Sequence, residues 1–167
     1  DAFHSYKPKD DKLKILKDPH IGAFSVIMLA TYGMVYISSV SEITADVLYS
    51  FAGAFFVSRC LSAITVVTLK SAKEDGMLHT FSSSVKGKSD RIVLVVLTMQ
   101  LILGCTFMIW MNVMAGSLMI VAEILFCVYY RYKTYRELDG ITGDTAGWFV
   151  TVSEIVMAVV AAVWCIM

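Results

Sequence analysis

Five long apolar stretches limit what this chain can fold into. A helix of about 20 residues, rising about 1.5 Å per residue, crosses the hydrocarbon core of a bilayer. Hydrophobic residues make up 57% of the chain, charged residues only 17%, and mean hydropathy is +0.70, too apolar for an ordinary soluble domain. Strand-like alternation is absent, and helices satisfy their own backbone hydrogen bonds in lipid. We therefore predict an all-α, polytopic membrane bundle forming one domain over residues 1–167, with spans at about Ile21–Val40, Val47–Leu69, Ile92–Asn112, Met114–Tyr130 and Thr145–Met167.

The positive charges gather in three of the segments outside these spans. Every lysine and arginine except Arg59 lies before the first span, between the second and third, or between the fourth and fifth. The connectors Ser41–Asp46 and Asn112–Gly116 hold none. Basic segments of membrane proteins stay predominantly in the cytoplasm. We therefore expect a multi-pass protein of the cell (inner) membrane whose active face is cytoplasmic.

The basic segments suit anionic lipid and a polyphosphate substrate equally well. We expect the lipid bilayer and no nucleic acid as partner, and leave a homo-oligomer open. The four cysteines fall in four different predicted spans and form no C-x-x-C pair, so neither a disulfide framework nor a zinc site is indicated.

Three ionisable residues lie inside predicted spans. Arg59, Glu123 and Glu154 lie about 16, 12 and 15 Å from the cytoplasmic ends of their helices, so they can share one layer. An unpaired charge at this depth costs several kcal/mol. The three residues therefore form a structural ion pair or triad, or they line a polar cavity in which Arg59 faces a substrate phosphate.

The loop Asp139–Gly147, directly before the last span, carries the most specific pattern. In the simplest interpretation Asp144 is the N-cap of a helix and the glycines form a turn. The combination also fits ligand binding. A helix N-terminus attracts phosphate whereas aspartates repel it, and Mg²⁺ resolves this conflict because it binds aspartate carboxylates and phosphate oxygens together. The loop thus predicts a site for Mg²⁺ and a pyrophosphate.

These residues resemble a known family. Gly140–Gly147, with Glu154 further along the helix, is similar to the G-x-T-G-D-x-x-G signature of cobalamin synthases, the adenosylcobinamide-GDP ribazoletransferases. Leu16–Phe24 resembles the family's K-D-x-x-I-G-A-Y/F segment at the start of a membrane helix. Arg59 lies where the family carries an arginine in the next helix, and Lys73–Met77 resembles its R-x-E-G-M/L loop.

Asp1-Ala2 look like the last two residues of the family's aspartate-rich D-G-x-x-D-x-x-D-G/A motif. We therefore expect the chain to be the C-terminal part of a longer, N-terminally truncated protein. Two positions depart from the family pattern, Asp139 where a glycine is common and Trp148 where a small residue is common.

The resemblance implies an enzyme for the last step of cobalamin nucleotide-loop assembly. In that step α-ribazole, or its 5′-phosphate, displaces GMP from adenosylcobinamide-GDP with Mg²⁺. The roles implied are metal binding by Asp1 and Asp144, catalysis by Asp144 and Asp18, and substrate binding by Lys17, Arg59, Lys73, Glu74, Thr142 and Gly143.

Two other classes compete with this interpretation. One is another membrane phosphotransferase or prenyltransferase, although the longer aspartate motifs of those enzymes are not found in the sequence. The other is a small membrane transporter in which Arg59, Glu123 and Glu154 line a polar pathway.

Overall fold

The computed structural model describes residues 1–18, 20–72 and 88–167. A short 3-10 helix, η1 (Ala2–His4), and helix α1 (Lys9–Ile15) precede five long helices: α2 (Ala23–Ser41), α3 (Ala45–Thr68), α5 (Lys88–Met111), α6 (Val113–Leu138) and α7 (Gly143–Ile166). Each long helix contains a segment long and apolar enough to cross a membrane. The predicted all-α polytopic bundle is confirmed.

The fourth span is the one whose boundary differs most from the prediction. It was predicted to end at Tyr130, because the basic residues that follow break the apolar run, but α6 continues to Leu138. Tyr130, Thr134 and Leu138 are fully buried and recur every four residues, so one face of the helix stays packed for two further turns. The basic residues occupy the other faces of this extension.

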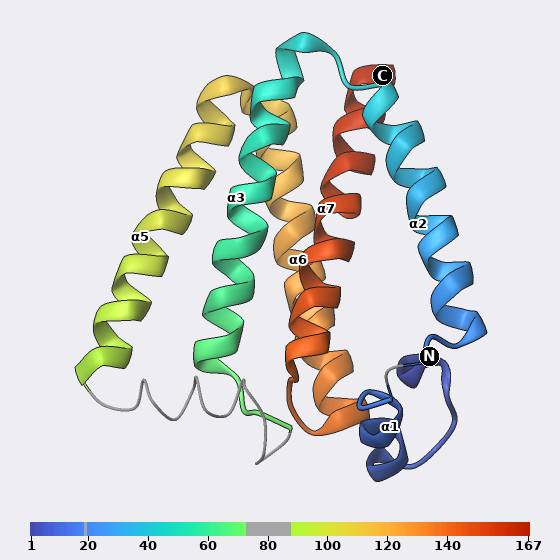
Figure 1. Cartoon of the computed structure of the whole chain (residues 1–167). Helices are drawn as coiled ribbons and strands as arrows, with labels where there is room; N and C mark the ends of the chain where they lie inside the picture. Colours follow the sequence, from blue (N-terminus) through green and yellow to red (C-terminus); the bar gives the residue numbers. More distant parts are fainter. Residues whose placement is uncertain (19, 73–87) are drawn as a thin grey trace.

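The long helices form a central group with one helix on either side (Figure 1). In the centre, α7 packs against α3 and α6, while α5 packs against α3 and α6, and α2 packs against α7. Only 6% of the apolar window of α2 and 11% of that of α5 is buried, against 44% for α3. These two peripheral helices therefore turn most of their apolar side chains outward, as expected of helices that face lipid.

The described parts of the basic segments lie at one end of the bundle, which we call the basic end. This end, at the bottom of Figure 1, holds helix α1, the start of α2, the end of α3, the start of α5 and the loop between α6 and α7. The α2–α3 and α5–α6 turns lie at the opposite end with the C-terminus. Among the described residues, the basic and non-basic connectors thus lie at opposite ends of the bundle, as predicted.

Met108 of α5 is in close contact with both α3 and α6. Its side chain is fully buried, and its carbonyl oxygen accepts a hydrogen bond of 2.8 Å from the Ser50 hydroxyl of α3. A Cβ at Gly53 would lie 2.6 Å from the Met108 Cγ, and one at Gly116 would lie 2.7 Å from the Met108 carbonyl carbon. Small residues let membrane helices approach in this way, so packing and hydrogen bonding replace the hydrophobic effect between helices.

Gly116→Ala should destabilise the bundle, because its new Cβ would meet backbone atoms of α5 that cannot rotate away. Overpacking of this kind typically costs about 1–3 kcal/mol. Gly33→Ala is the matched control, since a Cβ at Gly33 meets nothing within 4 Å. Thermal unfolding in detergent should show a lower midpoint for Gly116→Ala only. An unchanged midpoint for that variant would contradict the close packing at Met108.

Candidate functional site

The first turns of α7 present an open surface at the basic end. Gly143, Asp144 and Gly147 are exposed, and we call them the α7 amino face. A Cβ at Gly143 or Gly147 would meet nothing within 4 Å, so packing within the described structure does not require glycine at either position. Each glycine costs a helix about 1 kcal/mol relative to alanine. An open backbone beside a carboxylate is therefore the distinctive feature of this surface.

A capping box fixes where α7 begins. The Thr142 hydroxyl accepts a hydrogen bond of 3.2 Å from the Thr145 N–H, and the Thr145 hydroxyl accepts one of 2.9 Å from the Thr142 N–H. Both residues are buried. The interpretation of Asp144 as the N-cap is therefore wrong: the cap is Thr142, and Asp144 lies in the first turn. The Thr142 hydroxyl caps α7 by accepting the Thr145 N–H, and its predicted role in substrate binding stays a prediction.

The loop before α7 is held from two sides. Asp139 ends α6 in the left-handed conformation, with φ of 59°, and its carboxylate accepts hydrogen bonds from Lys9 at 3.2 Å and Lys70 at 3.1 Å. The Lys70 ammonium, and then that of Lys9, lowers the pKa of this carboxyl. Aspartate tolerates the left-handed conformation better than most residues, which explains how it replaces the family's glycine.

A short parallel bridge ties the same loop to the segment after α3. The Ile141 N–H donates to the Lys70 carbonyl oxygen at 2.9 Å, and the Ala72 N–H donates to the Ile141 carbonyl oxygen at 2.8 Å. A Cβ at Gly140, which has φ of 155°, would lie 2.5 Å from the Lys70 carbonyl oxygen. Glycine is thus needed here for backbone approach. Of the predicted site residues, Lys73 and Glu74 lie outside the described residues.

Asp1 is placed at the start of α2. Its carboxylate accepts hydrogen bonds from the Gly22 N–H at 2.9 Å, the Ser25 N–H at 3.2 Å and the Ser25 hydroxyl at 2.6 Å. A Cβ at Gly22 would lie 2.5 Å from the Asp1 Cγ, so the glycine of the I-G-A motif makes room for the carboxylate. Two motifs that were recognised separately are therefore in direct contact.

Asp18 and Lys17 lie in the connector before α2 and are exposed. The Asp18 carboxylate accepts the His20 N–H at 2.9 Å and lies 2.7 Å from the His20 Nδ1. These bonds lower the pKa of Asp18, the backbone bond most, and so weaken it as a proton acceptor. The Lys17 side chain makes no hydrogen bond or ion pair with any part of the chain that the structure describes.

Two of the three charged residues in the spans form an ion pair, and the third is hydrogen-bonded to a serine. The Arg59 guanidinium forms an ion pair with Glu154 of α7 and donates to the Phe55 carbonyl oxygen at 2.8 Å. Glu123 is buried and accepts a hydrogen bond of 2.7 Å from the Ser153 hydroxyl. The Arg59 side chain remains 57% exposed, whereas that of Glu154 is 12% exposed. The charge partner of Arg59, which the sequence left open, is therefore Glu154.

A cavity of about 590 Å³ lies between α2, α6 and α7. Gly143, Gly147 and Thr151 recur every four residues on one face of α7, and Thr151 lines the cavity, which therefore adjoins the α7 amino face. The Phe3 and Trp148 rings lie 5.2 Å apart and bring η1 against α7. Sequence reasoning missed this cavity. The available signal was a set of α6 residues spaced three or four apart that line the cavity: Phe126, Tyr129 and Lys133.

The residues at the basic end supply few metal ligands by themselves. Within residues 1–18, 20–72 and 88–167, no three His, Cys, Asp or Glu side chains form a group that could hold a metal ion. Asp144 is exposed and forms no hydrogen bond or ion pair with these residues through its side chain. Mg²⁺ commonly binds one or two carboxylates and completes its shell with water and substrate phosphates. Asp144 fits that requirement, whereas the Asp1 oxygens already accept hydrogen bonds at α2.

Arg59→Met should destabilise the folded protein, because Glu154 would lose its charge partner between α3 and α7. The Glu154 side chain is only 12% exposed, so its carboxylate would be left largely buried without a cation, which should lower the thermal midpoint. Adding Glu154→Gln should restore the thermal midpoint in detergent, whereas adding Glu123→Gln should not, since Ser153 already serves Glu123. Equal rescue by both second substitutions would contradict the assigned pairing.

Comparison with known proteins identifies the family. The family model described as "Cobalamin-5-phosphate synthase" matches residues 1–162. A protein of Lachnoclostridium phytofermentans named adenosylcobinamide-GDP ribazoletransferase is 35% identical over 164 residues, covering 97% of this chain and 62% of the relative. Proteins of the same name from Clostridium botulinum and Fusobacterium nucleatum are 30% and 27% identical, each covering 93% of this chain and, respectively, 61% and 62% of the relative.

The chain thus spans somewhat over 60% of the length of these relatives. No solved structure matches it significantly. The family match extends from η1 through most of α7 and includes every described segment of the site. The chain belongs to the cobalamin-5-phosphate synthase family.

Proposed function

We propose that the chain takes part in the Mg²⁺-dependent transfer that joins α-ribazole, or its 5′-phosphate, to adenosylcobinamide-GDP. A hydroxyl oxygen of the ribazole forms a bond to the phosphorus that carries the cobinamide. The bond from this phosphorus to the bridging oxygen of the pyrophosphate breaks, and GMP leaves with that oxygen. The hydroxyl proton passes to a base or to water. The names of the relatives support this reaction class.

The observation that carries the proposal is the open α7 amino face. Gly143 and Gly147 leave the helix backbone uncovered, and Asp144 places a carboxylate between them. The N-terminal end of α7 has a partial positive charge that attracts phosphate, while Asp144 opposes an anion unless a cation is shared. A pyrophosphate substrate together with Mg²⁺ satisfies both features. The capping box and the Lys70 bridge keep this surface in place before any substrate arrives.

Bound Mg²⁺ would neutralise charge on the pyrophosphate, with Asp144 as its ligand and Asp1 as the second predicted ligand. Lys17 and Arg59 keep their predicted roles in phosphate binding, and Lys73 and Glu74 are predicted to contribute from outside the described residues. Asp18 is the predicted proton acceptor. The polar pathway required for a transporter receives less support, because Glu123 is buried and hydrogen-bonded to Ser153, while Arg59 is paired with Glu154.

We also propose that the basic end faces the cytoplasm, where nucleotide-linked substrates would reach the α7 amino face. The asymmetry of basic residues between the two ends of the bundle supports this orientation.

Asp144→Asn in the natural protein should lower the turnover of adenosylcobinamide-GDP by about 100-fold or more, as expected when one electrostatic contact to the reacting group is removed. Thermal stability should change by less than about 1 kcal/mol, because Thr142 caps the helix and Asp144 contributes only through the helix dipole. Product formation and thermal unfolding measure the two effects separately. Normal turnover would exclude Asp144 from the reaction.

Gly147→Leu tests the open backbone in the same assay. The leucine should block substrate binding and raise KM, while the helix remains folded because nothing lies within 4 Å of the new Cβ. Gly33→Leu is its control, placed in α2 where a Cβ also meets nothing. Equal activity of the two variants would show that no ligand approaches the α7 amino face.

A cysteine at position 42 reports the orientation. Glu42 is exposed in the α2–α3 turn, at the end opposite the basic end. Glu42→Cys, in a variant lacking the four native cysteines, should react with a membrane-impermeant maleimide added outside the cytoplasmic membrane. Lys7→Cys, at the basic end, is the matched variant and should react only after the membrane is permeabilised. The reverse pattern would invert the proposed orientation.

A further inference from the structure

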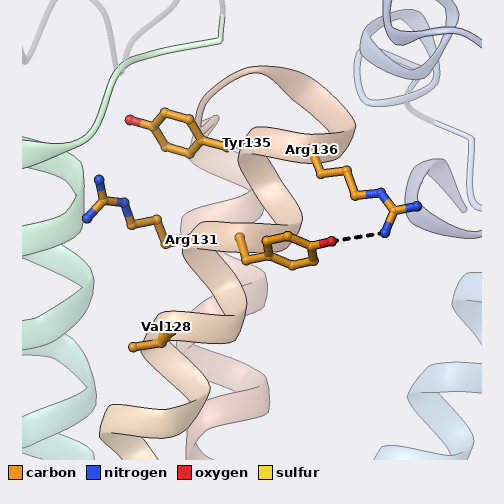
Figure 2. A pocket seen from close by; sticks show the side chains of 5 residues that line it. Val128, Arg131, Tyr135 and Arg136 are labelled. Atoms are coloured by element: carbon orange, nitrogen blue, oxygen red, sulfur yellow. Dashed lines mark hydrogen bonds between the residues drawn. The ribbon is translucent and has the colours of Figure 1, made fainter.

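The outer surface of α6 carries a groove of about 470 Å³ at the basic end, which we call the α6 arginine groove. It is lined by Val128, Arg131, Tyr132, Tyr135 and Arg136. Figure 2 shows the two guanidinium groups on opposite flanks of the helix, with Val128 nearer the middle of the bundle. The groove therefore combines two cations with an apolar floor.

Both arginines are held by tyrosine rings. The Arg131 Cζ lies 5.9 Å from the centre of the Tyr135 ring, and the Arg136 Cζ lies 6.0 Å from that of Tyr132. Arg136 also donates a hydrogen bond of 3.1 Å to the Tyr132 hydroxyl, drawn as the dashed line in Figure 2. A guanidinium lying over a ring keeps most of its N–H groups available to a ligand.

Neither arginine has a carboxylate partner in the part of the chain that the structure describes. Three nearby lysines differ in this respect, because Lys9 and Lys70 pair with Asp139, and Lys12 pairs with Glu137. The three lysines near the α6–α7 loop are therefore neutralised by carboxylates, whereas Arg131 and Arg136 on the outer face of α6 have no such partner among the described residues. This surface is complementary to an anion.

An apolar strip leads from the groove toward the middle of α6. Val121, Leu125 and Val128 are 54%, 66% and 64% exposed, and with Tyr132 they recur every three or four residues along one face. Arginine and tyrosine at the end of such a strip are typical of the boundary between hydrocarbon and headgroups. A ligand that fits the whole surface has an anionic head and an apolar chain.

The groove is separate from the proposed reaction site. Phe126 and Tyr130 point toward Phe149 of α7, and at about 100° per residue the groove residues lie on the opposite face of α6. A ligand of the groove is therefore on the outside of the bundle, away from the α7 amino face.

We propose that the α6 arginine groove binds an anionic phospholipid, with the anionic headgroup lying between the flanking Arg131 and Arg136 and one acyl chain along the Val121–Val128 strip. Anionic lipids of the cytoplasmic leaflet attract basic residues at helix ends. The groove adds two ordered guanidinium groups and an apolar floor to this general attraction. The protein would thus carry a bound lipid at a defined position on α6.

The test is native mass spectrometry of the purified chain in detergent, titrated with dioleoylphosphatidylglycerol or dioleoylphosphatidylcholine. The wild type should retain phosphatidylglycerol in preference to phosphatidylcholine. Replacing both groove arginines (Arg131→Gln with Arg136→Gln) should weaken phosphatidylglycerol binding by about 30-fold, since each interfacial arginine contributes roughly fivefold. Circular dichroism of the variant should remain that of the folded bundle, because both side chains are exposed.

The matched control removes two other exposed cations from the basic end, Lys7→Gln with Arg91→Gln, and should bind phosphatidylglycerol as the wild type does. Equal weakening in this control would show only a general effect of net charge and would overturn the proposal. Retained binding in the groove variant would also overturn it. Displacement of the lipid by inorganic phosphate alone would identify an anion site without lipid selectivity, which contradicts the proposal as well.

Discussion

Close approach of helices at Met108 is the contact on which the rest of the bundle depends. Without a hydrophobic driving force between helices in lipid, α3, α5 and α6 need small residues and a satisfied carbonyl to remain together. Gly53, Gly116 and Ser50 meet that need around one residue. The small side chains of Ala158 and Ala161 extend the same buried layer to α7. Toward the basic end, α5 diverges from α6 (Figure 1).

The candidate site lies where those helices end. The segments that follow α3 and α6 come near enough for the Lys70 carbonyl oxygen to accept a hydrogen bond from the Ile141 N–H, and the resulting bridge positions Thr142, which caps α7. The Asp139 carboxylate also accepts hydrogen bonds from two lysines of separate segments, Lys9 and Lys70, and so holds the same loop from two further points. The exposed glycines of α7 are thus displayed by a loop that is held on several sides. A rigid support beneath an open surface is what positioning of a phosphate group requires.

Hydropathy alone predicted the number of long helices and most of their boundaries, because lipid imposes a minimum length and an apolar composition on every span. It failed at the end of α6, where burial of Thr134 and Leu138, rather than hydropathy, continues the helix. Short motifs singled out Asp144 and Asp1 but did not predict their contacts. Asp1 bonds to α2, and Thr142 caps α7, since these choices depend on backbone geometry that a motif does not encode. The cavity and the Arg59–Glu154 pair depend on how distant helices face one another.

The Arg59–Glu154 pair also has a consequence for how the protein is made. Its members are 95 residues apart in the chain, and synthesis proceeds from the N-terminus. At about 5–20 residues per second, α3 waits roughly 5–20 s for its acidic partner. During that time the insertion machinery must accept an uncompensated arginine, at a cost of about 2.5 kcal/mol near a helix centre. Until Glu154 is made, the insertion cost of Arg59 must be offset by the apolar side chains of α3 alone, among them Phe51, Phe55, Phe56, Leu61 and Ile64. Biogenesis, as well as the finished fold, therefore sets how apolar α3 has to be.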